Sequence, residues 1–227
     1  MLSNEHPYIK PLTKAFKAAA DPGNAVFQKA YMRDQFEFFG LKTDARREIT
    51  KNYFRSNKID NYDTLEQVVK ELWSLPQREY QYAAQELLEN NKKIWTEKTI
   101  QLIEHCITHK SWWDTVDTLN SYGAGIYFQK FPRSTKQITT IWNSSNNIWL
   151  NRSSLLFQLK YKDKTDTELL GRYIRNLSGS KEFFIQKAIG WMLREYSKTN
   201  AAWVRTFIKE NKLAGLSVRE GSKYLDR

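Results

Sequence analysis

The chain has 227 residues, of which 36 are lysine or arginine and 25 are aspartate or glutamate, so its formal net charge is +11. An excess of this size attracts polyanions and makes nucleic acid the leading partner, although it also fits an inert basic surface. Only 9 glycines and 5 prolines occur, which argues against a turn-rich β-sandwich or barrel and favours an all-α fold. The single cysteine, Cys106, excludes an internal disulfide, a four-cysteine zinc site and an iron–sulfur cluster.

The sequence is expected to carry no leader or membrane segment. Residues 1–7 lack a basic stretch followed by an apolar run, and no run of about eighteen apolar residues occurs anywhere. We therefore expect a soluble, monomeric, cytoplasmic protein that is associated with the nucleoid when it is on DNA. His105 and His109 are four residues apart but have no obvious third ligand, so we expect a helical surface pair, no metal site and no cofactor.

The N-terminal part of the chain is predicted to be helical. Residues 1–40 are expected to form helices that close the N-terminal end of a helical stack. This segment contains three phenylalanines, Phe36, Phe38 and Phe39. The next helix is predicted to be capped by Thr43, with Asp44 near the positive end of the helix dipole. We expect repeats from about residue 41 to residue 227, within a single domain that spans the whole chain.

One type of segment then recurs: a small polar or turn residue, a short charged or aromatic turn, and an apolar-periodic stretch. It occurs at residues 75–80, 111–114, 145–149, 180–184 and 217–220. The first residues of these segments are 36, 34, 35 and 37 positions apart. Serine opens the last four and is predicted to be an N-cap, so each segment should begin a helix.

Each period has room for a second helix. Residues 166–174 are an example, because their apolar side chains recur at helical spacing. Paired helices with a period near 35 residues predict an α-solenoid of HEAT-like repeats, in which each pair buries its apolar faces against its neighbours.

Equivalent positions of successive repeats line up along one face of a solenoid, so the repeat starts predict a basic concave groove for DNA. The predicted stripe consists of Arg46, Arg47, Arg78, Trp112, Trp113, Arg152, Lys181, Lys187, Arg194, Lys198 and Arg219. Within and beside it, we expect DNA contacts from Thr43, Arg46, Arg47, Arg194 and Lys198. Three other tryptophans have apolar neighbours and are predicted to be core residues: Trp73, Trp95 and Trp142.

Three segments contain long and unusual motifs. They read KSWWDTVD at 110–117, NIWLNR at 147–152 with FQLKYK at 157–162, and SKEFFIQKAIGW at 180–191. In these segments, and over most of its length, the chain resembles the bacterial DNA-alkylation-repair glycosylases built from HEAT-like repeats, the AlkD type. The last repeat departs from the family pattern, because Ser217-Val218-Arg219 stands where paired arginines are usual.

The resemblance implies a monofunctional enzyme that removes purines alkylated at N3 or N7 from double-stranded DNA and leaves an abasic site, without placing the base in a pocket. It implies catalytic roles for Asp117, Trp113 and Trp191 and a DNA contact for Arg152. Tyr31 matches, over a shorter segment, a family residue that faces the DNA.

The chemistry of these residues fits that activity. A carboxylate such as Asp117 can stabilise the oxocarbenium-like sugar and orient or deprotonate the attacking water, although an acid near a helix start also fits a cap or a surface ion pair. The indoles of Trp113 and Trp191 attract cations, but either could instead pack in the core. Arg152 could clamp a phosphate or form an ion pair between repeats.

Two other functions also fit the sequence. One is a DNA-binding helical-repeat protein without catalytic activity, and the other is a protein–protein scaffold, since the fold alone does not determine the function. Binding that weakens with salt would favour a nucleic-acid partner, because phosphate contacts release counterions.

Overall fold

The computed structural model describes residues 6–225, and these residues are helical throughout their regular structure. No strand occurs among them, apart from an isolated bridge between Glu37 and Gln77. The predicted all-α class is confirmed, and the arrangement is consistent with an α-solenoid. No helix in residues 6–225 combines the length and the apolar character that crossing a membrane requires. The expectation drawn from residues 1–7 falls mostly on residues 1–5, which lie outside the described part of the chain.

The chain divides into two compact units, residues 1–102 and residues 103–227. The boundary falls inside helix α6 (Thr99–Thr108). The expected single repeat domain over residues 1–227 therefore stays a prediction, and each unit is described by itself.

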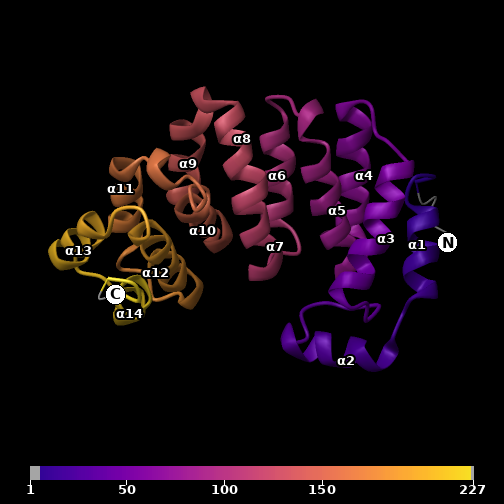
Figure 1. The fold of residues 1–227 in the computed structure, drawn as a ribbon, viewed down its shortest axis with the longest axis horizontal. Coiled ribbons are helices and arrows are strands. Elements are labelled where there is room, and N and C mark those ends of the chain that lie inside the picture. The colour runs from indigo at the N-terminus through magenta and orange to yellow at the C-terminus, as the bar shows by residue number, and fades with distance from the viewer. Residues whose placement is uncertain (1–5, 226–227) are drawn as a thin grey trace. The chain divides into compact units, whose positions relative to one another are not determined.

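Residues 6–98 of the first unit contain five α-helices, together with a short 3₁₀ segment. They are α1 (Lys10–Ala18), α2 (Pro22–Tyr31), α3 (Thr43–Ser56), α4 (Tyr62–Ser74), α5 (Arg78–Asn90) and η1 (Lys92–Ile94). Helices α4 and α5 pack side by side, and α3 packs against both α1 and α5 (Figure 1). Trp73 and Trp95 are buried, as predicted for core tryptophans. The indole Nε1 of Trp95 donates a hydrogen bond to the Leu88 carbonyl at 3.0 Å, so its polar atom is satisfied in the core.

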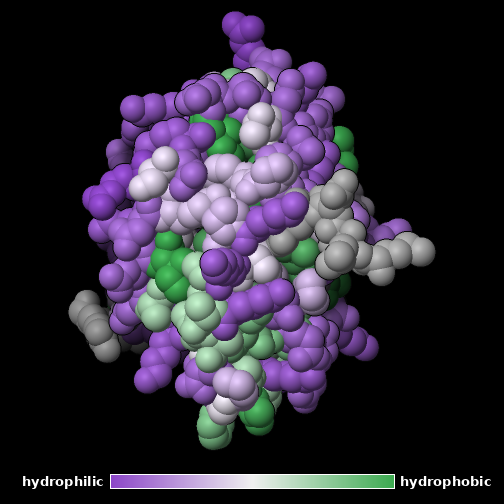
Figure 2. All heavy atoms as spheres, turned by 90° about the vertical axis from the view of Figure 1, so that its right-hand side faces the viewer, coloured by the Kyte–Doolittle hydropathy of each residue, from purple (hydrophilic) through white to green (hydrophobic). Residues whose placement is uncertain are grey.

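Helix α2 differs from α1, α3, α4 and α5 because it has no buried residue. It stands apart from α3, α4 and α5 in Figure 1. Val26, Phe27 and Tyr31 are exposed on it, and Figure 2 shows hydrophobic side chains gathered at the level of α2 on an otherwise largely hydrophilic face. The amides of Asn24 and Gln28 donate hydrogen bonds to backbone carbonyls at residues 40 and 41, which tie this helix to the segment that follows it.

The prediction that residues 1–40 are helical is correct for α1 and α2 but wrong for the segment with Phe36, Phe38 and Phe39. Helix α2 ends at Tyr31. Arg33 and Asp34 have positive φ angles, which are incompatible with a right-handed helix, so the helix cannot continue through them. The backbone N–H groups of residues 39, 40 and 41 donate instead to the carboxylate of Glu79. Because a side chain from α5 satisfies these donors, the segment needs no helical hydrogen bonds.

The second unit contains the remaining helices. They are α7 (Trp113–Thr118), η2 (Leu119–Ala124), α8 (Gly125–Lys130), η3 (Pro132–Ser134), α9 (Thr135–Asn143), α10 (Ile148–Leu156), η4 (Lys162–Lys164), α11 (Thr167–Leu177), α12 (Phe183–Ser197), α13 (Ala201–Glu210) and α14 (Gly215–Gly221). Helices α7 and α8 are joined without a break by the π-helical stretch η2. Helix α12 packs against α10, α13 and α14. Trp142 is buried as predicted, and α11 covers the helix expected at residues 166–174.

The predicted period matches four of the helix starts but not the last, because α14 begins at Gly215, 32 residues after the start of α12. Helices α5, α7, α10 and α12 begin at Arg78, Trp113, Ile148 and Phe183, which are each 35 residues apart. Another helix lies between each pair of starts, so the two-helix reading of the period is also correct. The HEAT-like character of the repeats and the basic concave groove stay predictions.

The predicted caps are wrong, because none of the four serines caps its helix. The hydroxyls of Ser145 and Ser180 accept hydrogen bonds from the N–H groups two residues later, in turns that precede the helices. Ser111 donates back to the Ile107 carbonyl, and Ser217 lies inside α14. Short hydroxyl side chains form such local turns as readily as caps, so their position alone does not fix the helix start.

The predicted cap at Thr43 is wrong as well. The capping position of α3 is Lys42, and Thr43 is the first residue of the helix.

Gly125 allows the α7–η2–α8 helix to approach the end of α10 closely. A Cβ atom at this position would lie 2.6 Å from the carbonyl oxygen of Phe157 and 3.0 Å from that of Asn120. The hydroxyl of Tyr161 also donates to the Gly125 carbonyl at 2.7 Å. Backbone oxygens cannot rotate away as a side chain can, so any added group must push the two helices apart.

We therefore expect Gly125→Ala to lower the free energy of unfolding by about 1–3 kcal/mol, the usual cost of an overpacked core. Chemical denaturation of both proteins measures the difference. Gly179→Ala is the matched control, because a Cβ there meets nothing within 4 Å. Equal losses in the two variants would show that the close approach at Gly125 carries no special cost.

Candidate active site

A cleft of about 380 Å³ in the second unit brings together five of the ten residues that the sequence predicts to act in catalysis or DNA binding. It is lined by Trp113, Asp117, Arg152, Phe183, Phe184, Lys187, Trp191, Arg194 and Glu220. All three predicted catalytic residues and two predicted DNA contacts, Arg152 and Arg194, belong to this set. The catalytic candidates are neither scattered nor sealed in the core, since Trp113, Asp117 and Trp191 are each partly exposed.

Helical spacing explains which side chains face the cleft. Trp113 and Asp117 are four residues apart on α7, so they lie on one face of that helix. Lys187, Trp191 and Arg194 have the same relationship on α12. Arg152 comes from α10, which packs against both α7 and α12.

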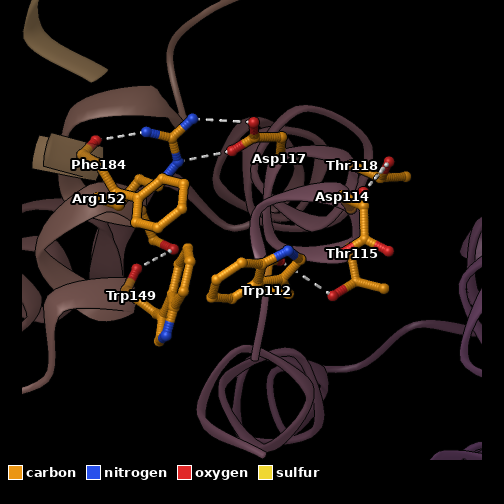
Figure 3. A network of polar contacts seen from close by, with 9 residues as sticks. Trp112, Asp114, Thr115, Asp117, Thr118, Trp149, Arg152 and Phe184 are labelled. Carbon is orange, nitrogen blue, oxygen red and sulfur yellow. Dashed lines mark hydrogen bonds and ion pairs between the residues drawn. The ribbon is translucent and has the colours of Figure 1, made fainter. Parts of the chain in front are cut away.

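Arg152 and Asp117 form a bidentate ion pair at the base of the site. The Nε atom of Arg152 donates to Oδ1 of Asp117 at 2.7 Å, and Nη2 donates to Oδ2 at 2.8 Å (Figure 3). Nη1 donates to the backbone carbonyl of Phe184. The side chains of Arg152 and Asp117 are only 5% and 16% exposed. The two parallel hydrogen bonds fix the plane of the carboxylate. Of the two roles that the sequence suggested for Arg152, the structure shows the ion pair between helices.

Burial and charge act on Asp117 in opposite directions. Desolvation raises the pKa of the Asp117 carboxyl, and the nearby charge of Asp114 adds to that rise. The hydrogen bonds and the charge of Arg152 lower it. Burial is the larger effect, so the pKa of Asp117 lies above its ordinary value.

An aromatic cluster lies beside the ion pair (Figure 3). The ring centroid of Trp112 lies 5.9 Å from that of Trp149 and 5.3 Å from that of Phe184. The centroids of Trp149 and Phe184 are 5.0 Å apart. The indole Nε1 of Trp112 is buried without a hydrogen-bond partner in the described part of the chain. Trp112 therefore supports the site as an apolar neighbour instead of extending a basic stripe. Its apolar surroundings strengthen the hydrogen bonds of the adjacent ion pair.

Glu220 is a cleft residue that the sequence analysis did not identify. Its carboxylate lies 3.1 Å from Lys187, 2.8 Å from Arg194 and 2.9 Å from Lys223. Phe183 and Phe184 were likewise quoted only as part of a motif. The spacing of Phe183, Lys187 and Trp191 could have placed all three on one face of α12. No local signal exists for Glu220, because it reaches the cleft from a different helix, α14.

Lys198, another predicted DNA contact, does not line this cleft. It pairs with Glu195 at 2.7 Å and lines a separate cleft of about 360 Å³ in the same unit.

The other predicted DNA contacts belong to the first unit. Tyr31 and Thr43 are exposed, and the side chain of Arg47 is 67% exposed. Arg46 is buried and pairs with Glu86 at 2.7 Å. Their roles in DNA binding stay predictions.

The prediction that Arg78 lies on a surface stripe is wrong. Its side chain is fully buried, and its guanidinium lies 3.8 Å from the centroid of the Phe36 ring. Stacking on this aromatic ring and burial at the start of α5 make Arg78 a core residue of the first unit.

No group of three or more side chains suited to hold a metal ion occurs in residues 6–225. The rings of His105, in α6, and His109, directly after the end of α6, stack with their centroids 4.1 Å apart.

Arg152→Met should raise the pKa of Asp117 further. The substitution removes both hydrogen bonds and the positive charge that lower this pKa, while burial, which raises it, remains. The carboxylate form should therefore be lost at a higher pH in the variant than in the wild type. Carbon-13 NMR titration of the aspartate carboxyls measures both values. Arg133→Met, at an exposed position of η3, is the control that should leave Asp117 unchanged. A lower pKa of Asp117 in Arg152→Met would contradict the role given to burial.

Comparison with known proteins places the chain in a family. The family profile described as "DNA alkylation repair enzyme" matches residues 12–225. A solved structure described as "Predicted DNA alkylation repair enzyme from Enterococcus faecalis" is similar, with a TM-score of 0.86 and 34% sequence identity over 92% of this chain and 97% of that chain. A comparison with curated proteins gave no match. The chain therefore belongs to the DNA alkylation repair enzyme family.

Proposed function

We propose that the protein is a DNA glycosylase, of the type the sequence resembles, that hydrolyses the N-glycosidic bond of cationic N3- or N7-alkylated purines in duplex DNA. The observation that carries the proposal is the cleft in which the carboxylate of Asp117 lies together with the indoles of Trp113 and Trp191. Membership of a DNA alkylation repair family supports damaged DNA as the substrate.

The chemistry of the substrate explains why so few groups suffice. Alkylation at N3 or N7 gives the purine a full positive charge, and the base leaves as a neutral molecule. As the bond breaks, positive charge moves to the deoxyribose, and a nearby carboxylate stabilises that charge. Asp117 has this role in the proposal. A normal purine or a neutral lesion such as uracil has neither the charge nor the labile bond, so selectivity requires no base-shaped pocket.

Asp117 is also the group that activates water in the proposed reaction. A carboxylate offers about four acceptor positions, and the two hydrogen bonds from Arg152 occupy only two of them. The remaining lone pairs can orient or deprotonate a water for attack on the anomeric carbon. Arg152 thereby fixes the carboxylate without consuming its capacity to accept a proton.

Trp113 and Trp191 complete the environment of the sugar in this proposal. The face of an indole attracts a cation by about 1 kcal/mol when exposed and about 2 kcal/mol when desolvated. Both side chains are partly buried, so we expect each indole to contribute nearer to 2 kcal/mol than to 1 kcal/mol. Their contribution adds to that of the carboxylate as the sugar becomes positively charged.

Duplex DNA is the proposed partner, and phosphates are its contact points. Three of the five N–H groups of Arg152 donate within the protein, which leaves two for a phosphate oxygen. Arg194 and Lys187 add positive charge to the same cleft. Further contacts are proposed for Tyr31, Thr43, Arg46, Arg47 and Lys198.

Asp117→Asn tests the proposal directly. Release of N7-methylguanine from duplex DNA should slow by about 100-fold or more in single-turnover assays, because the amide carries no charge and is no base. Asp163→Asn, at an exposed position outside the cleft, is the control with unchanged rate. Equal release by wild type and Asp117→Asn would remove Asp117 from the mechanism. DNA binding without release by the wild type would favour the non-catalytic function instead.

Borohydride should trap no covalent complex between the protein and alkylated DNA. Trapping requires a free amine that forms a Schiff base with the sugar. The one lysine that lines the cleft, Lys187, has its ammonium group 3.1 Å from the carboxylate of Glu220, in an ion pair. We therefore expect a monofunctional enzyme whose product is an intact abasic site. A trapped adduct that disappears in Lys187→Gln would overturn this expectation.

A further inference from the structure

Glu220 gathers three cations around one carboxylate. Oε1 lies 3.1 Å from Nζ of Lys187, and Oε2 lies 2.8 Å from Nη1 of Arg194 and 2.9 Å from Nζ of Lys223. Only 7% of Glu220 is exposed. Hydrogen bonds from Lys223 and Lys187 lower the pKa of Glu220 to about 2, so this group is ionised at neutral pH.

The backbone places this carboxylate against α12. A Cβ atom on Gly190 would lie 2.5 Å from Cβ of Glu220 and 3.0 Å from the Ser217 carbonyl oxygen, so only glycine permits this approach of α14. The hydroxyl of Ser217 donates to the Gln186 carbonyl at 2.9 Å and fixes the register of the two helices. The position of Glu220 is thus set by helix packing and not by its own flexible side chain.

Two of the three cations belong to the cleft. Lys187 and Arg194 lie four residues before and three residues after Trp191, on the same face of α12, and all three line the site. Glu220 pairs with both of these cations, so it bridges the two helical turns that present the tryptophan. Lys223 does not line the cleft and approaches Glu220 from the turn that follows α14.

We propose that Glu220 is a positioning residue that holds Lys187 and Arg194 in place to receive the phosphates beside a damaged nucleotide. It also offsets part of their charge, so that undamaged DNA is held less tightly. This inference rests on the proposed glycosylase function. Lysine and arginine side chains are long and flexible, and a shared carboxylate restricts their rotamers before DNA arrives.

Glu220→Gln tests this role in the full chain, since glutamine keeps the shape and removes the charge. The first measurement is binding to undamaged duplex DNA over a range of salt concentrations. Two released cations should steepen the slope of log K against log salt by up to about 1.8, because each phosphate contact contributes about 0.9. A residue that only stabilises the fold would leave this slope unchanged or make it shallower.

The second measurement is single-turnover release of N7-methylguanine at saturating enzyme. We expect it to slow about tenfold in Glu220→Gln, because misplaced phosphate contacts misalign the sugar. Lys209→Met, at an exposed position of α13 outside the cleft, is the control and should change neither the slope nor the rate appreciably. A steeper slope with a slower rate supports the proposal. An unchanged slope, or weaker binding together with a shallower slope, overturns it.

A second variant covers the case in which Glu220→Gln does not fold. The double substitution of Lys187 and Arg194 by glutamine should make the salt slope shallower and slow release. The size of this change plus the steepening in Glu220→Gln should together reach at most about 1.8, the contribution of two phosphate contacts. An unchanged slope in that variant would overturn the inference. If the wild type releases no base at all, the glycosylase proposal fails, while the salt slopes still decide whether Glu220 controls these two cations.

Discussion

The buried ion pair between Arg152 and Asp117 is the interaction on which the candidate site depends. It joins α10 to α7 and, through the Phe184 carbonyl, reaches α12. Removing one partner of such a pair leaves an uncompensated charge and costs about 3–5 kcal/mol, so a single substitution at either residue also lowers the stability of the protein. The same pairing serves catalysis in the proposed reaction. The carboxylate of Asp117 must stay oriented toward the developing sugar cation, and Arg152 provides the hydrogen bonds that fix this orientation where the indoles exclude water.

Close helix packing, more than loop geometry, builds the surroundings of this pair. Gly125 brings the helix that carries Asp117 against the end of α10, and Gly190 brings α14 against the helix that carries Trp191. In both places the neighbouring atoms are backbone or Cβ atoms, which cannot move without moving a helix. The cleft therefore inherits the rigidity of the packed helices, and a site that acts mainly by electrostatic stabilisation benefits from that rigidity.

Features with a local physical cause could be predicted from the sequence. The 35-residue period, the buried tryptophans and the shared face of Trp113 and Asp117 follow from helical periodicity. The serine caps and the helical path of Phe36, Phe38 and Phe39 were wrong because distant or competing hydrogen bonds decide them, as Glu79 does for residues 39–41. Glu220 could not be found, since its three partners come together only after α14 packs on α12.

The positive charge of the chain is a poor guide to which cations bind DNA. Arg78 is fully buried against Phe36, Arg46 pairs with Glu86, and Arg152 pairs with Asp117. A buried guanidinium needs such a partner, so the number of arginines in the sequence overstates the net positive charge that is available to attract a phosphate. What an arginine or lysine adds to binding depends on the carboxylate that already holds it. This is why a single acidic residue such as Glu220 can govern the response of a basic cleft to salt.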